Sequence, residues 1–178
     1  MKYISSLGFA FNVDASREAL GAAPWDQYRW RTEHPKSPHR EASDIWLRYN
    51  AIENLGPHFN ESHESVWYPV AEELPPLKHL ANVIASEVGA IELGGVLLTK
   101  VPPGKQVYRH VDHGWHAEHY EKFAVLISGD ERQSFCYEDG EFHSRAGEAF
   151  TFNNQACHWV KNPTNIDRVT LIVCARRH

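Results

Sequence analysis

The stretches Phe123-Ala-Val-Leu-Ile-Ser128 and Val169-Thr-Leu-Ile-Val-Cys-Ala175 decide the expected fold of this chain of 178 residues. Both are short apolar runs, a pattern typical of strands that are buried on both faces. Around them the sequence predicts further short strands at residues 95–101, 107–111, 133–137, 141–143 and 149–152. Asp139-Gly140 is a strong hairpin turn signal. Many short strands with turns at close intervals predict a sandwich or a jelly roll.

The first part of the chain is less regular. Residues 14–22 predict a short helix, and residues 77–88 predict an amphipathic helix with apolar side chains at i, i+3, i+4 and i+7. Residues 44–49 alternate between polar and apolar, as a half-buried strand does, and residues 24–43 predict a loop.

We therefore expect one domain, 1–178, that is mainly β with a few helices and has a double-stranded β-helix (jelly roll, cupin-like) core. In this scheme, helical and irregular elements from residues 1–94 pack on a core built from residues 95–178.

Composition excludes several functional classes. The formal charge is −5 and basic residues do not cluster, which argues against nucleic-acid binding. The three cysteines show no C-x-x-C spacing, which indicates free thiols in a reducing compartment. No apolar run approaches membrane-spanning length, and the N-terminus lacks the apolar segment of a signal peptide. We expect a cytoplasmic protein with no membrane partner.

The motif with the clearest chemical meaning is His110-Val-Asp112, followed far downstream by His158. Side chains at i and i+2 of a strand point to the same face, so His110 and Asp112 project side by side. Two histidines and one carboxylate leave three positions open on an octahedral ion, which is the facial triad of non-haem Fe(II) oxygenases. The dyad alone is a weak signal in a chain with 12 histidines, but both candidate segments follow a turn into a predicted strand.

Arg168 stands ten positions after His158, at the start of the last predicted strand. The co-substrate of many such oxygenases, 2-oxoglutarate, carries a distal carboxylate that needs a cationic partner. The guanidinium fork of arginine matches a carboxylate with two parallel hydrogen bonds. Taken with the triad, Arg168 is therefore the candidate that anchors 2-oxoglutarate.

Residues 95–175 resemble the aspartyl/asparaginyl β-hydroxylase family of Fe(II)/2-oxoglutarate oxygenases. The resemblance rests on the order and spacing of Pro103-Gly104, His110-Val-Asp112-His113-Gly114, Gly147-Glu148, Phe152-Asn153-Asn154, His158-Trp-Val-Lys-Asn162 and Asp167-Arg168-Val169. It implies a dioxygenase that uses O₂ and hydroxylates an aliphatic C–H bond of an amino-acid-like or peptidyl (Asp/Asn-type) substrate.

The same resemblance implies roles for single residues. His110, Asp112 and His158 would be the Fe(II) ligands, and Arg168 would hold the distal carboxylate of 2-oxoglutarate. Lys122 stands where a second basic residue is usual, although an arginine is common there. Thr99 stands where a hydroxyl that binds the co-substrate would lie.

Substrate contacts are expected from two polar, aromatic segments. Residues 113–120, rich in histidine, follow the dyad directly, and Trp115 or His116 would line the substrate pocket. The segment 37–49 could pack against the open end of the barrel, with Arg40, Trp46 and Arg48 as candidate contacts.

Three alternatives stay open. The spacings Gly104-x5-His110-x-Asp112 and Gly147…His158-x3-Asn162 also resemble cupin motifs, and cupins include metalloenzymes that need no keto acid. His113, His116 and His119 follow Asp112 at steps of three and could bind zinc in a hydrolase. A binding module that has lost its chemistry is the third, against which the intact triad argues.

Overall fold

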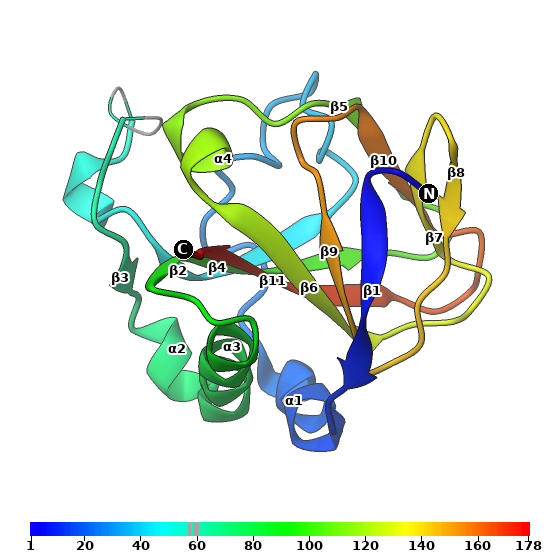
Figure 1. Ribbon diagram of the computed structural model, residues 1–178, viewed down its shortest axis with the longest axis horizontal. Coiled ribbons are helices and arrows are strands. Elements are labelled where there is room, and N and C mark those ends of the chain that lie inside the picture. The colour runs from blue at the N-terminus through cyan, green and yellow to red at the C-terminus, as the bar shows by residue number, and fades with distance from the viewer. Residues whose placement is uncertain (57, 59–60) are drawn as a thin grey trace.

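The computed structural model describes residues 1–56, 58 and 61–178, and it has two antiparallel sheets (Figure 1). The large sheet has the order β1 (Ile4–Ala10), β9 (Glu148–Phe152), β6 (Glu121–Ser128), β11 (Arg168–Arg176), β4 (Glu92–Val101), β2 (Ser43–Tyr49) and β3 (Val66–Trp67). The small sheet has the order β5 (Gln106–His110), β10 (His158–Lys161), β7 (Ser134–Tyr137) and β8 (Gly140–Phe142).

From β4 onward the chain passes back and forth between the two sheets. β4, β6, β9 and β11 lie in the large sheet, and β5, β7, β8 and β10 lie in the small one. This alternation is the winding of a double-stranded β-helix. The predicted fold class, a mainly β jelly roll with few helices, is confirmed.

Three helices lie on the side of the large sheet that faces away from the small sheet (Figure 1). They are α1 (Asp14–Ala19), α2 (Val70–Glu73) and α3 (Pro75–Glu87); two single turns of 3-10 helix span Leu20–Ala22 and Ile52–Asn54. The predicted amphipathic helix is α3, whose buried residues are Leu77, Leu80, Ala81, Ile84 and Ala85. Across the described ranges, none of the helices has the length and apolar character required to cross a membrane.

The main core lies between these helices and the large sheet. On β6 the alternate residues Phe123, Val125 and Ile127 belong to this core, which also contains Leu77 and Ile84 of α3. Burying each such side chain contributes roughly 1.5–3 kcal/mol. The outer face of the large sheet is thereby committed to packing, which leaves its inner face for the residues described below.

Two local expectations need correction. The sequence reasoning assigned no strand before residue 14, yet Ile4–Ala10 forms β1 and pairs with β9. β2 is not half-buried, because only Ser43 and Arg48 in it escape full burial. Its polar residue Asp44 is completely buried in an ion pair with Arg31.

Candidate functional site

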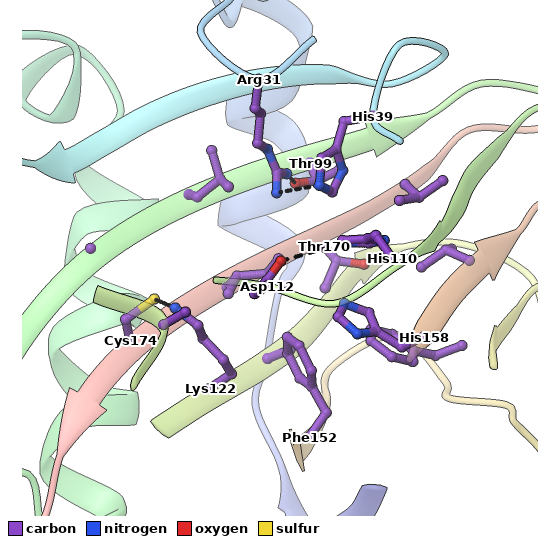
Figure 2. A pocket seen from close by; sticks show the side chains of 18 of the residues that line it. Arg31, His39, Thr99, His110, Asp112, Lys122, Phe152, His158, Thr170 and Cys174 are labelled. Atoms are coloured by element: carbon purple, nitrogen blue, oxygen red, sulfur yellow. Dashed lines mark hydrogen bonds and ion pairs between the residues drawn. The ribbon is translucent and has the colours of Figure 1, made fainter. Parts of the chain in front are cut away.

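A cavity of about 250 Å³ opens between the inner face of the large sheet and the small sheet (Figure 2). On β11 the alternate residues Arg168, Thr170, Ile172 and Cys174 line it, as the two-residue period of a strand requires. His110, Asp112 and His158 also line it. All six predicted metal and co-substrate residues, Thr99 and Lys122 included, thus border one cavity.

His110 and His158 are the central pair of the cavity. They are directly opposite each other in the pairing of β5 with β10, and their ring centroids are 4.2 Å apart. In each ring Nδ1 lies 2.8 Å from a backbone carbonyl two residues earlier, Tyr108 O for His110 and Ala156 O for His158. These carbonyls accept a hydrogen bond from Nδ1–H, which leaves Nε2 of each ring as the candidate ligand atom. Burial, with the charge of His110 second, lowers the pKa of His158 to about 4, so this ring is neutral at pH 7.

Asp112 follows β5 and is held by a hydrogen bond from its backbone N–H to Asn154 O. Its Oδ1 lies 3.4 Å from Nε2 of His110. Two ligand atoms on adjacent corners of an octahedron, each about 2.1 Å from the ion, would be about 3 Å apart. Partial burial opposes ionisation of Asp112, but the close contact with His110, together with the nearby His158 and Lys122, outweighs this effect and lowers its pKa. The spacing of His110 and Asp112 therefore fits two adjacent ligands of a divalent ion.

His39 is a neighbour that sequence reasoning missed. Ligand atoms of His39, His110 and Asp112 lie within 4.8 Å of one another, and the ring of His39 packs edge-on against His110 at 4.6 Å. Its Nε2 lies 3.5 Å from Nη1 of Arg31, which can only donate, so this lone pair is already engaged. His39 comes from an irregular loop, where no periodicity could have indicated which residue points inward.

Arg168 is buried, with 2% of its surface exposed. Its Nη1 donates to Oγ1 of Thr170 at 2.9 Å, and its buried Nε has no partner among the described residues. Within the described ranges it forms no ion pair, and burial lowers its pKa to about 10. An uncompensated buried guanidinium is costly, so an arginine placed in this way is suited to pairing with an anion.

Arg31 is the contrasting cation of the cavity. It makes two hydrogen bonds to the Asp44 carboxylate, at 2.6 and 3.0 Å, and Nη2 also donates to Oγ1 of Thr99 at 2.5 Å. Burial opposes its charge, but Asp44 raises its pKa overall. Arg31 is therefore neutralised within the protein, and it positions the Thr99 hydroxyl in the cavity wall.

Lys122 lines the cavity from β6, with 7% of its surface exposed. Its Nζ donates to Sγ of Cys174 at 3.0 Å and lies 3.4 Å from Nδ1 of His116. His116 belongs to α4 (Trp115–His119), a short helix that lines the cavity with His116 and Ala117. Nε2 of His116 accepts a hydrogen bond from Gly95 N at 3.0 Å.

The five candidate substrate residues do not all reach the cavity. Trp46 and His116 line it. Among the described residues that line the cavity, Arg40, Arg48 and Trp115 are not found. The Arg40 guanidinium lies 3.4 Å from the ring centroid of Tyr108, and Arg48 donates to the carbonyls of Leu93 and Gly94. Trp115 stacks on His119 at 4.6 Å.

The histidines of the alternative zinc site point to different partners. Nε2 of His116 accepts a hydrogen bond from Gly95 N. His119 stacks on Trp115, and its Nε2 lies 3.5 Å from the Glu92 carboxylate. Among the described residues, His113, His116 and His119 form no group whose ligand atoms lie close enough to share an ion with Asp112, so the zinc alternative loses its geometric basis.

A scan against protein-family models and a search of curated protein sequences both give no match. Solved structures with a similar fold include an oxidoreductase of the 2OG-Fe(II) oxygenase family from Burkholderia pseudomallei (13% identity, 98% of this chain and 84% of that chain, TM-score 0.57). They also include the viral collagen prolyl hydroxylase vCPH of Paramecium bursaria Chlorella virus-1, solved as a 2OG complex (10% identity, 99% of this chain and 96% of that chain, TM-score 0.54). A third is a prolyl-4-hydroxylase of Pseudomonas putida (17% identity, 98% of this chain and 92% of that chain, TM-score 0.50).

At these identities the similarity establishes the fold alone. Each of the three structures aligns with almost the whole of this chain. One of the three is described as a member of the 2OG-Fe(II) oxygenase family. None of the three is described as an aspartyl/asparaginyl β-hydroxylase, so that narrower resemblance stays a prediction.

Proposed function

We propose that this protein is an Fe(II)- and 2-oxoglutarate-dependent dioxygenase that hydroxylates an aliphatic C–H bond of an amino-acid-like or peptidyl (Asp/Asn-type) substrate. One observation carries the proposal. The same cavity contains a two-histidine, one-carboxylate donor set and the buried Arg168, which has no carboxylate partner among the described residues. The fold neighbours from the same group of enzymes support it.

His110, Asp112 and His158 would hold the ion, with the two Nε2 lone pairs already directed by backbone carbonyls. Bound together with 2-oxoglutarate and O₂, iron supplies the oxidising chemistry that hydroxylates an unactivated C–H bond. The side chains of the protein would bind the co-substrate and exclude water.

Arg168 and Thr170 would bind the distal carboxylate of 2-oxoglutarate by charge-assisted hydrogen bonds. Thr99 is the hydroxyl that Arg31 orients nearby on the paired strand β4. Phe152, Val160 and Ile172 give the cavity apolar walls. Such walls exclude water and strengthen each charge interaction inside the cavity.

The test is an anaerobic titration of the purified apo-protein with Fe(II) and 2-oxoglutarate. We expect the weak visible charge-transfer band of a chelated keto acid in the wild type, and none in His110→Ala or His158→Ala. His79→Ala, a change of a histidine on the far side of the large sheet in α3, is the matched control and should retain the band. A correctly folded wild-type protein that binds Fe(II) and gives no band would contradict the assignment of 2-oxoglutarate.

A second candidate is a cupin-type metalloenzyme that does not use 2-oxoglutarate, and His39 is the observation that favours it. A third imidazole close to His110 and Asp112 would occupy one of the positions that a chelating keto acid needs. If His39 were a ligand, His39→Ala would lower metal affinity as much as His158→Ala does. If it is not, His39→Ala leaves metal affinity unchanged.

A further inference from the structure

We propose that Lys122 and His116 form a subsite for a carboxylate of the substrate, separate from the co-substrate anchor at Arg168. The inference rests on the proposed function. It assigns to the unidentified substrate a chemical class, a small molecule or residue with one free carboxylate, and it gives Lys122 a different role from the one that the family resemblance implies.

The hydrogen-bond geometry around His116 is the first argument. The N–H of Gly95 can only donate, so Nε2 of His116 accepts and the proton of the neutral ring is on Nδ1. Nδ1–H and the Lys122 ammonium are then two donors 3.4 Å apart, and neither can accept from the other. Two such donors at a cavity wall are suited to one shared acceptor, such as a carboxylate oxygen.

The arrangement at Gly95 supports this reading. A Cβ on residue 95 would lie 3.1 Å from Nε2 of His116 and 3.1 Å from a ring carbon of Tyr49. Glycine therefore permits the close approach of His116 to the backbone of β4. That approach directs Nδ1 toward Lys122.

The second argument is the separation from Arg168. Arg168 donates a hydrogen bond to Thr170, and Lys122 donates one to Cys174. Cys174 lies four residues after Thr170 on β11. At about 3.3 Å per residue these anchors lie about 13 Å apart. Figure 2 shows Lys122 and Cys174 at one end of the cavity, away from His110 and His158. A keto acid held at Arg168 and at the metal uses both of its carboxylates, which leaves the Lys122–His116 pair for another anion.

Charge balance is the third argument. Arg31 and Asp44 neutralise each other. A divalent ion, Arg168 and Lys122 would bring four positive charges, against three negative ones from Asp112 and the two carboxylates of 2-oxoglutarate. One positive charge is left over in a cavity with apolar walls, where an unpaired charge is costly. A substrate with a single carboxylate at Lys122 restores neutrality.

The experiment uses trifluoropropionate as the probe and its uncharged amide as the matched ligand. The full-length protein is loaded with Zn(II) in place of iron and saturated with 2-oxoglutarate, so that no turnover occurs, and binding is followed by fluorine NMR. We expect the acid to bind to the wild type and the amide not to bind. Lys122→Met should weaken binding of the acid at least about tenfold, and His116→Leu should weaken it as well.

Two controls make the result specific. Lys100→Met, which changes a lysine over the ring of Trp25, should leave probe binding unchanged. The affinity for 2-oxoglutarate, measured from the Fe(II) charge-transfer band, should be the same in Lys122→Met as in the wild type. Loss of 2-oxoglutarate affinity comparable with that of an Arg168 variant would assign Lys122 to the co-substrate and overturn the proposal.

Equal binding of acid and amide, no binding of the acid to the wild type, or full binding in both variants would also overturn it. Failure of the proposed function appears separately, as the absence of the charge-transfer band in the wild type. The probe titration is read independently of that band.

Discussion

His110 and His158 stand directly opposite each other on two neighbouring strands, and each directs Nδ1 to the carbonyl oxygen two residues before it. The shared hydrogen-bond pattern holds both rings before any ion is bound. A pair of ligands that is already oriented loses little conformational freedom when it binds metal. The small sheet thus supplies the rigid half of the candidate metal site, and Asp112 supplies a carboxylate just beyond the end of β5.

Replacement of His158 by alanine should weaken binding of a divalent ion by more than about 100-fold, since loss of a supporting residue alone typically costs 10–100-fold. Isothermal titration with Co(II) or Mn(II) measures this directly. Cys157→Ala, one position earlier, should leave the affinity within about twofold. Equal affinity in wild type and His158→Ala would remove His158 from the ligand set.

Arg168→Met should have opposite effects on co-substrate binding and on stability. Loss of the guanidinium should weaken 2-oxoglutarate binding by about 100-fold, which corresponds to about 2.7 kcal/mol. The apo-protein should be at least as stable as the wild type, because the variant buries no uncompensated charge. Titration of the charge-transfer band and thermal unfolding measure the two effects. Arg145→Met, at an exposed ion pair, is the control.

His116 should make the apo-protein less stable in acid. Burial, followed by the charge of Lys122, holds its pKa at about 2, against about 6.5 in the unfolded chain. Below pH 6.5 the unfolded chain takes up a proton that the folded chain does not. The free energy of unfolding therefore falls as the pH falls, by up to about 1.4 kcal/mol per pH unit, and this contribution is constant above pH 6.5.

Urea unfolding at pH 7 and at pH 5 tests this dependence. Between the two, the wild type should lose about 2 kcal/mol more stability than His116→Asn, which has no group that titrates at this position. His79→Asn, on the far side of the large sheet in α3, should behave like the wild type. Identical losses in wild type and His116→Asn would show that His116 is not a buried neutral base.

Gly147→Ala should destabilise the fold by about 3 kcal/mol. Gly147 has a φ of +85°, and a Cβ there would lie 2.3 Å from the carbonyl oxygen of Phe11. The Phe11 N–H donates to Gly147 O at 2.9 Å, so the clash would separate the end of β1 from the turn before β9. Thermal unfolding measures the loss. Gly21→Ala, where an added Cβ would meet no atom within 4 Å, is the control and should not destabilise.

Asp44→Asn should cost about 3–5 kcal/mol, because it leaves the buried guanidinium of Arg31 without its charge partner. Thermal unfolding checks this against Glu131→Gln, which breaks an exposed ion pair with Arg145 and should change little. A small effect of Asp44→Asn would mean that Arg31 is not neutralised within the protein, and the charge balance behind the carboxylate subsite would need revision.

Local patterns were sufficient for the regular elements. The apolar runs of β6 and β11 and the 3.6-residue period of α3 each depend on neighbours in the chain, so they were predicted close to their observed bounds. β1 was missed because its burial alternates only weakly, and its place at the sheet edge depends on pairing with β9. The half-burial expected for β2 was wrong because both faces of that strand are covered.

For the site, the sequence by itself predicted that His110 and Asp112 lie side by side, from the two-residue period of a strand. The two side chains do lie together, although β5 ends at His110 and Asp112 lies just beyond it. It also identified the chemical types at Thr99, Lys122, His158 and Arg168, which line the cavity. Only the tertiary structure decided that His158 faces His110, that Arg31 is neutralised by Asp44 while Arg168 is not, and that His39 joins the cluster. Such facts depend on which side chains from distant segments meet, and a linear pattern carries no information on the partners of a charge.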